Sequence, residues 1–292
     1  MRVRAKSALI MAPLLIIVFL GGYFLVAGVI VLTIMALREF SAAFVEKKPA
    51  LWVFWVSLAV LYGGFLYSAI KWSKFDSSIS ILGNTQQIFF GLLPLWTFIS
   101  VALCLIAMFA MEKRDLIHGM AAFVGVFYIV FFAFHLVLVD FGPVGPLAVG
   151  ALRLSGFHSY VWIVLMSSFG TDIFAFFTGK AFGKRKLCPT ISPKKTVAGA
   201  IGGVLGSIIL CGVFSWIFMP TEFWTCIIIG AAGGVFAQFG DLAASVMKRK
   251  IGIKDWGTLI PGHGGILDRL DSILFVAPLV YYILFFKSFI GF

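Results

Sequence analysis

Nine long apolar stretches limit what this chain can fold into. They run over residues 8–20, 22–37, 51–70, 88–111, 116–139, 159–178, 197–218, 223–246 and 270–290. Hydrophobic residues make up 61% of the chain and charged residues only 12%, whereas about a quarter of an ordinary soluble domain is charged. A soluble protein of this composition could not cover its surface, so we expect the stretches to cross a membrane as α-helices.

The predicted fold is an all-α polytopic membrane protein with about nine transmembrane helices. Only Gly21 and Gly22 interrupt the first two stretches, and one kinked helix there would leave eight. No polar linker or low-complexity segment divides the chain, so residues 1–292 are expected to form a single integral membrane domain. Residues 1–150 are expected to supply scaffold helices, and residues 159–292 the catalytic helices and loops.

The basic residues are unevenly distributed over the segments between these stretches. Of the 23 Lys and Arg residues, 19 fall on one side if the N-terminus is cytoplasmic. The other four are Lys71, Lys74, Arg153 and Lys287. Cytoplasmic loops carry such an excess of Lys and Arg, so we expect the later loops to face the cytoplasm in either the nine-helix or the eight-helix arrangement. The chain length and the absence of further targeting segments favour a bacterial inner membrane.

The net charge of +11 does not indicate a nucleic-acid partner, because the basic residues lie beside the apolar stretches. Anionic lipid headgroups and nucleotide phosphates are the expected partners. The four cysteines form no C-x-x-C pair, and no Cys/His cluster indicates zinc.

Polar side chains that suit chemistry gather in the second half of the chain. Asp172 lies within an apolar stretch, where an ionisable group is costly and marks a functional candidate. Asp241, Ser245, Lys248 and Arg249 would share one face of a helix. A carboxylate, a hydroxyl and two cations on one face are suited to binding both metal and phosphate. The alternative for Asp172 is a packing role.

The segment Ser192-Pro193-Lys194-Lys195-Thr196 precedes another apolar stretch. Ser192 suits a helix N-cap and Pro193 the first helical position, so we predict that a helix begins here. A helix N-terminus beside Lys194 and Lys195 would bind polyphosphate. The alternative is that both lysines only anchor the helix at the membrane interface.

A long loop then leads into the last apolar stretch. Its glycines, Gly262, Gly264 and Gly265, would let the backbone approach a ligand closely. Asp268 and Asp271 are three residues apart, so they project from the same side of a starting helix. Carboxylate oxygens of this kind suit Mg²⁺.

These residues together resemble the signature of the phosphatidate cytidylyltransferases, also called CDP-diacylglycerol synthases. The matching positions between residues 245 and 271 are Ser245, Lys248, Arg249, Lys254, Asp255, Gly257, Pro261, Gly262, His263, Gly264, Gly265, Asp268, Arg269 and Asp271. Asp172 and the segment from Ser192 to Thr196 resemble that family in order and spacing. The resemblance covers residues 170–272 closely, and the first 150 residues only by span pattern.

The resemblance implies that CTP and phosphatidate give CDP-diacylglycerol and pyrophosphate. Asp241, Asp268, Asp271 and Asp172 would hold Mg²⁺ and a possible second cation. The expected catalytic residues are Asp241, Asp268, Asp271, Lys248, Arg249, Arg269 and His263. Those expected to bind substrate are Ser192, Lys194, Lys195, Thr196, Ser245, Lys254, Asp255, Gly264 and Gly265. Lys254 and Asp255 are expected to form an ion pair, and His263 either to move a proton or to shape the backbone.

One position departs from the family pattern. The family commonly has an acidic residue shortly after the lysine pair, and this chain has Ala198 there. Two other functions stay open from sequence alone: a different CTP-using lipid enzyme, such as a polyprenol kinase, and an ion-coupled transporter. The oligomeric state is also open, with a homodimer as one option.

Overall fold

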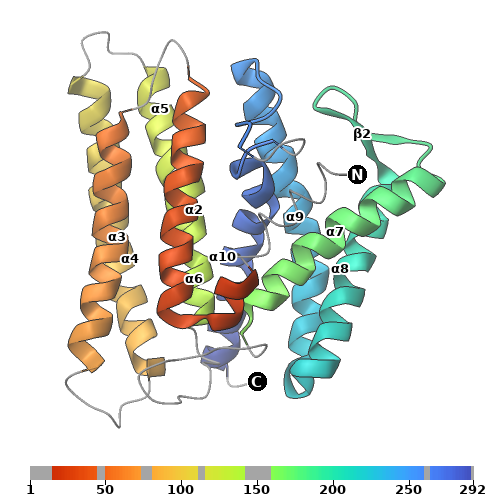
Figure 1. Cartoon of the computed structure of the whole chain (residues 1–292), viewed down its shortest axis with the longest axis horizontal. Helices are drawn as coiled ribbons and strands as arrows, with labels where there is room; N and C mark the ends of the chain where they lie inside the picture. Colours follow the sequence, from red (N-terminus) through yellow and green to blue (C-terminus); the bar gives the residue numbers. More distant parts are fainter. Residues whose placement is uncertain are drawn as a thin grey trace.

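The chain folds into a bundle of long helices (Figure 1). The structure is a computed structural model that describes residues 15–44, 50–73, 81–110, 116–141, 159–259 and 264–290. Its helices are α2 (Gly22–Ala42), α3 (Leu51–Ser73), α4 (Ile81–Ala110), α5 (Leu116–Val124), the π-helix η1 (Gly125–Phe131), α6 (Phe132–Asp140), α7 (Val161–Phe182), α8 (Val197–Phe218), the 3₁₀ turn η3 (Pro220–Glu222), α9 (Phe223–Ile251) and α10 (Leu267–Ile290). Helices α5, η1 and α6 follow one another without a break and form one continuous helical segment. The predicted all-α class is confirmed.

Eight helical segments of the described residues are long and apolar enough to cross a membrane. These segments correspond to the second to ninth predicted stretches. Gly21 and Gly22 have φ values of 61° and 53°, which end the helical run at residues 15–20. Residues 15–20 turn back onto α2, since a Cβ atom on Gly28 would lie 2.6 Å from Ile17 Cγ2. Residues 8–14 of the first predicted stretch lie outside the described residues.

Helix α10 joins the two parts of the bundle. In Figure 1, α2 to α6 stand together on one side, and α8, α9 and the oblique α7 stand on the other. Helix α10 contacts α6 and α2 as well as α9 and α7. The last helix of the chain therefore packs against both its first and its second half.

Helices α7, α8 and α9 approach one another through glycines. A Cβ atom on Gly170 would lie 2.9 Å from the carbonyl oxygen of Gly206, and one on Gly234 would lie 2.9 Å from Val204 Cα. Small residues at such contacts let helix backbones pack closely, as is common in membrane bundles. A hydroxyl pair reinforces the contact, because Ser167 Oγ lies 2.9 Å from Ser207 Oγ. These three helices form a closely packed frame for the residues described below.

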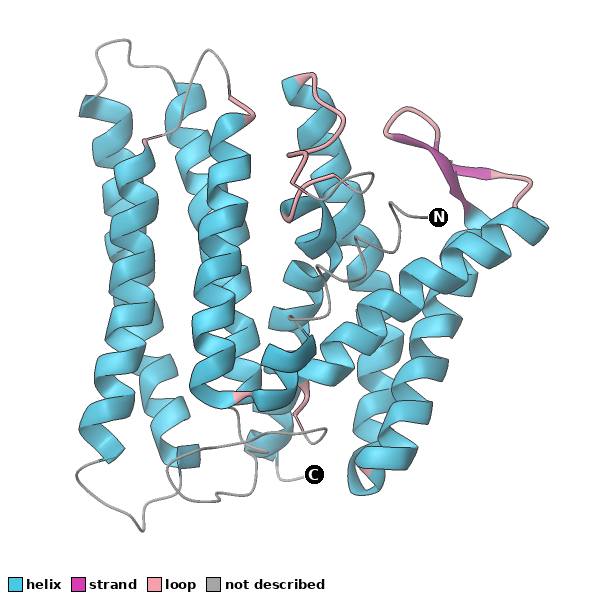
Figure 2. Ribbon diagram, viewed as in Figure 1, coloured by secondary structure: helices cyan, strands magenta, loops and turns pink. Residues whose placement is uncertain are grey.

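A short β-hairpin, absent from the sequence prediction, connects α7 and α8 (Figure 2). Strands β1 (Lys186–Cys188) and β2 (Ser192–Thr196) pair antiparallel. The predicted helix start at Ser192 is therefore wrong. The N-cap of α8 is Thr196, whose Oγ1 accepts the N–H of Gly199 at 3.1 Å. Pro193 fixes φ at a value that is compatible with a helix or with a strand. Pairing with β1 stabilises the strand.

The hairpin, the ends of α7 and α9, and the start of α10 lie toward the same end of the bundle in Figure 1. We call this end the loop face. The loop that joins α9 to α10 also lies there, and we call its described residues, 252–259 and 264–266, the signature loop.

Candidate active site

Four carboxylates approach one another near the loop face. Helix α7 supplies Asp172, α9 supplies Asp241, and the first turns of α10 supply Asp268 and Asp271. Asp172 and Asp241 line the same cavity, and α9 meets α10 beside them, since a Cβ atom on Gly240 would lie 2.5 Å from the carbonyl oxygen of Asp271. Asp271 is only 8% exposed. As they stand, no three His, Cys, Asp or Glu side chains of the described residues are close enough together to hold a metal ion.

A cavity of about 350 Å³ with several charged and polar side chains in its lining opens between α7, α8, α9 and the hairpin, and we call it the polar cavity. The predicted residues Asp172, Lys194, Lys195, Thr196 and Asp241 line it. Other lining residues are Thr171, Phe176, Gly179, Lys180 and Gln238. The structure thus brings the predicted lysine pair and two predicted carboxylates to one cavity. Ser192, at the far end of β2, does not line it.

Asp241 binds two neighbours at the edge of this cavity. Lys195 Nζ lies 2.6 Å from Asp241 Oδ2. On the other oxygen, Ser245 Oγ donates a hydrogen bond of 3.3 Å to Oδ1. Asp241 and Ser245, predicted to share one face of a helix, are thus one helical turn apart and in contact. Lys195 is held by a carboxylate and is poised to exchange it for another anion.

The start of α8 contributes less to anion binding than we expected. The N–H of Val197 donates to the carbonyl of Arg185 at 3.0 Å, and the N–H of Gly199 donates to Thr196. Two of the backbone N–H groups that have no partner within the helix therefore already donate to other groups of the protein. The positive charge of the cavity comes chiefly from its lysine side chains.

Asp268 holds the signature loop together. Its Oδ1 lies 2.6 Å from Lys248 Nζ, and both side chains of this ion pair are buried. Its Oδ2 accepts the backbone N–H groups of Trp256 at 2.8 Å and Gly265 at 2.9 Å. Protein donors therefore occupy both oxygens. These contacts attach the signature loop to α10, and the role of Asp268 as a metal ligand stays a prediction.

Glu39, near the end of α2, was missed by the sequence analysis. Its Oε1 accepts the N–H of Ile266 and its Oε2 the N–H of Leu267, both at 2.9 Å. These are free donors at the N-terminus of α10, where a carboxylate is stabilised by the helix dipole. The adjacent Phe40 packs its ring 5.3 Å from that of Trp256. No local pattern marks Glu39, because its partners are 227 and 228 residues away.

The glycines of the signature loop make room for these carboxylates. A Cβ atom on Gly257 would lie 2.7 Å from Glu39 Oε1, and one on Gly265 would also meet the Glu39 carboxylate. Gly264 has φ 83°, and a Cβ atom there would lie 2.8 Å from Asp268 Oδ2. Both glycines therefore lie against carboxylates of the protein, and their approach to a substrate stays a prediction.

The remaining predicted residues have different surroundings. Arg249 turns to its own loop and donates to the carbonyl of Ile253 at 2.9 Å. Lys254 and Asp255 are both exposed, and in the described part of the chain no ion pair joins them. The charge of Arg269 acts on Asp172. His263 lies outside the described residues.

Comparison with known proteins identifies similar chains. The profile of the Cytidylyltransferase family matches residues 2–287. A phosphatidate cytidylyltransferase of Bacillus subtilis is 36% identical over 213 residues, which cover 66% of this chain and 77% of that protein. The enzyme of the same name from Staphylococcus haemolyticus is 40% identical over 51% of this chain and 57% of its own length. That of Synechocystis is 41% identical over 48% and 53%.

Proposed function

The chain belongs to the cytidylyltransferase family, and we propose that it is a phosphatidate cytidylyltransferase of the membrane. It would transfer the cytidylyl group of CTP to phosphatidate, releasing CDP-diacylglycerol and pyrophosphate. The observation that carries this proposal is the polar cavity. That cavity places Lys194, Lys195 and two carboxylates at the end of a bundle of apolar helices. A polyphosphate and a lipid headgroup can meet there.

The lysines would bind the triphosphate of CTP. Lys194 and Lys180 line the cavity with exposed side chains. Lys195 is paired with Asp241. A phosphate oxygen would compete for its ammonium group, and Asp241 would then be released to bind another cation. The nucleotide would thereby complete its own site.

The transfer itself needs positioning and charge neutralisation more than covalent chemistry. A phosphatidate oxygen would attack the α-phosphorus of CTP in line. The bond from the α-phosphorus to the bridging oxygen would break, and that oxygen would leave with pyrophosphate. Arg269, whose charge acts on Asp172, is suited to the phosphate of the lipid.

Asp241 and Asp271 fit a role in holding Mg²⁺, with Asp172 beside them. Mg²⁺ commonly binds one or two carboxylates, and waters and substrate phosphates complete its shell. Two neighbouring carboxylates, one of them buried, repel each other, and a cation between them would relieve this repulsion. When bound, the ion would neutralise charge on the phosphates. Any second cation and a homodimer stay predictions.

The loop face is proposed to face the cytoplasm of a bacterial cell. It carries Arg38, Lys180, Lys184, Arg185, Lys186, Lys194, Lys195, Lys248, Arg249, Lys250 and Lys254, whereas Lys287 lies near the end of the last helix. This distribution follows the positive-inside rule. CTP would then reach the cavity from the cytoplasm.

Reconstitution of the purified protein in lipid vesicles tests the function. We expect CTP and phosphatidate together to yield pyrophosphate and CDP-diacylglycerol. A polyprenol kinase would release CDP with a polyprenol and no pyrophosphate, and a transporter would consume no nucleotide. Absence of pyrophosphate release with every phosphatidate tried would overturn the proposal.

A further inference from the structure

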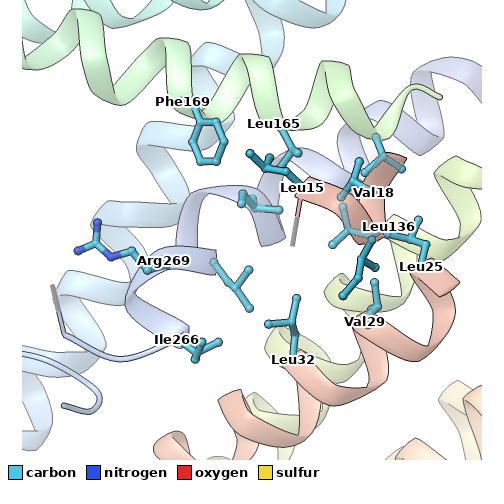
Figure 3. A pocket seen from close by; sticks show the side chains of 15 residues that line it. Leu15, Val18, Leu25, Val29, Leu32, Leu136, Leu165, Phe169, Ile266 and Arg269 are labelled. Carbon is cyan, nitrogen blue, oxygen red and sulfur yellow. The ribbon is translucent and has the colours of Figure 1, made fainter. Parts of the chain in front are cut away.

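A second cavity, of about 180 Å³ and almost entirely apolar, lies between α2, α7 and α10 (Figure 3). Leu25, Val29 and Leu32 line it from α2, and Leu165 and Phe169 from α7. Arg269 is the only charged side chain among the described residues that line it. An apolar cavity of about 150 Å³ with similar walls stays dry and binds small hydrocarbons. This cavity therefore suits hydrocarbon rather than water.

The apolar and the polar cavity follow one another along a single face of α7. Leu165, Phe169, Asp172 and Phe176 have the spacing i, i+4, i+7 and i+11, which places them on one side of a helix. The first two line the apolar cavity, and the last two line the polar cavity. Along α7 the lining thus changes from hydrocarbon side chains to a carboxylate within less than one helical turn.

Arg269 lies at this boundary. In Figure 3 its guanidinium group points away from the hydrocarbon side chains that surround the cavity. Asp172, three residues beyond Phe169 on α7, belongs to the polar cavity, and Asp268 and Asp271 share the first turns of α10 with Arg269. The side chain of Arg269 therefore lines the apolar space, and its positive charge lies at the edge of that space, on the helix that carries two of the carboxylates. A phosphate attached to a hydrocarbon chain would match both parts.

We propose that the apolar cavity binds a segment of one acyl chain of phosphatidate, with the lipid phosphate next to Arg269. The identity of the lipid rests on the proposed function, whereas the position of its chain rests on the two cavities. Bilayer lipid is as apolar as the cavity walls, so the chain gains little from entering hydrocarbon as such. The cavity serves to fix where the chain, and hence the phosphate, lies.

Filling the cavity tests this assignment. Val29 is buried and lines the cavity, whereas Val31 on the same helix is 54% exposed and lines neither cavity. Val29→Phe and Val31→Phe are therefore matched variants with the same change in volume. Their turnover is compared with dioleoyl phosphatidate and with dibutyryl phosphatidate, whose chains are too short to need the cavity.

We expect Val29→Phe to raise KM for dioleoyl phosphatidate on the order of tenfold, since hydrocarbon pockets discriminate single methylene groups by such factors. Its KM for CTP and its turnover of dibutyryl phosphatidate should stay near the wild-type values, which also shows that the variant is folded. Val31→Phe should behave as wild type with both lipids. Equal losses with both lipids, or no loss with either, would overturn the assignment.

Photocrosslinking locates the chain without relying on turnover. Phosphatidate with a diazirine in one acyl chain should label the α2 and α7 segments that line the cavity. Unlabelled phosphatidate should compete, but phosphatidylcholine should not, and Val29→Phe should lose the label that Val31→Phe keeps. Labelling that phosphatidylcholine abolishes equally would show an ordinary bilayer lipid and refute the proposal. This result stands even if the wild-type protein releases no pyrophosphate.

Discussion

Glu39→Gln perturbs the site from a helix that supplies none of the predicted site residues. In the structure both carboxylate oxygens of Glu39 accept backbone N–H groups at the start of α10. Glutamine has nearly the same shape but only one acceptor, and its NH₂ group would face the other N–H donor. The change therefore loosens the signature loop and leaves the polar cavity intact.

The expected size follows from these contacts. A hydrogen bond to a charged group contributes about 1.5–3 kcal/mol, and a carboxylate at a helix N-terminus up to about 2 kcal/mol. Loss of one such bond and of the charge should weaken loop attachment by about 3 kcal/mol, which is about a hundredfold in occupancy. The contacts of Asp268 still hold the signature loop, so they offset part of this weaker attachment. We therefore expect kcat to fall between about ten- and a hundredfold.

The assay measures pyrophosphate release in lipid vesicles at varied CTP. KM for CTP should change less than about twofold, because Glu39 does not touch the cavity lysines. Glu39→Asp, which keeps the charge, should recover part of the lost kcat. The matched control is Glu222→Gln, which removes a carboxylate that pairs with Lys287 near the other end of α10. This control should lower thermal stability but leave kcat unchanged.

A double-mutant cycle with Gly257 decides whether the effect runs through the loop. Gly257→Ala alone should lower kcat, since its Cβ would lie 2.7 Å from Glu39 Oε1. In a Glu39→Ala background the same change should cost little, because the obstructing carboxylate is gone. Strictly additive effects, or a Glu39→Gln enzyme with wild-type kcat, would refute the reasoning.

Five further substitutions test the rest of the site. Asp241→Asn and Asp271→Asn should each abolish pyrophosphate release while the protein still elutes as a folded species in gel filtration; near-normal rates in both would defeat the metal-site assignment. Lys194→Ala and Lys195→Ala should each weaken the binding of CTP by up to about 3 kcal/mol and thereby raise KM for CTP. Unchanged KM values would favour a role of both lysines as interface anchors. Lys248→Met leaves a buried carboxylate unpaired and should destabilise the fold by about 3–5 kcal/mol in thermal or denaturant unfolding; an unaltered transition would contradict the buried pair.

Hydropathy alone was enough to predict the membrane helices, because a helix that crosses a bilayer must be apolar along most of its length. The eight long segments agree with predicted stretches to within several residues at most ends. The turn at Gly21 and Gly22 was not predictable in the same way. Two glycines permit a straight, kinked or reversed chain, and the reversal depends on distant contacts: Ile17 packs against Gly28, and the N–H of Gly22 donates to Asp140 Oδ2 at 2.6 Å.

The sequence named the residues of the polar cavity but not the local structure that holds them. Lys194 and Lys195 were assigned to a starting helix, yet they lie on a strand. Serine and threonine are both good N-caps, so the choice between Ser192 and Thr196 depended on pairing with β1. Ala198 is accordingly the second residue of α8, out of helical register with both lysines. A glutamate at this position would therefore not pair with either lysine at a helical spacing.

Glu39 shows where reasoning from one sequence stops. A carboxylate near the end of an apolar stretch resembles any solvated helix end, and its partners are main-chain groups that carry no sequence signal. Asp268 illustrates the same limit in the opposite case, because its sequence pattern was recognised but its contacts were not. Its spacing to Asp271 is typical of a metal site, but the fold of the loop places backbone donors on one of its oxygens and Lys248 on the other.

The contact of Glu39 with α10 also sets an order of events during synthesis. The residues that line the polar cavity, from Thr171 to Asp241, are all translated before α10. Glu39 is translated long before them and meets its partners only when the last helix has emerged and inserted. A nascent chain that stops short of residue 266 therefore contains the complete lining of the polar cavity without the attached loop. Transfer activity should therefore appear only once α10 has been translated and inserted.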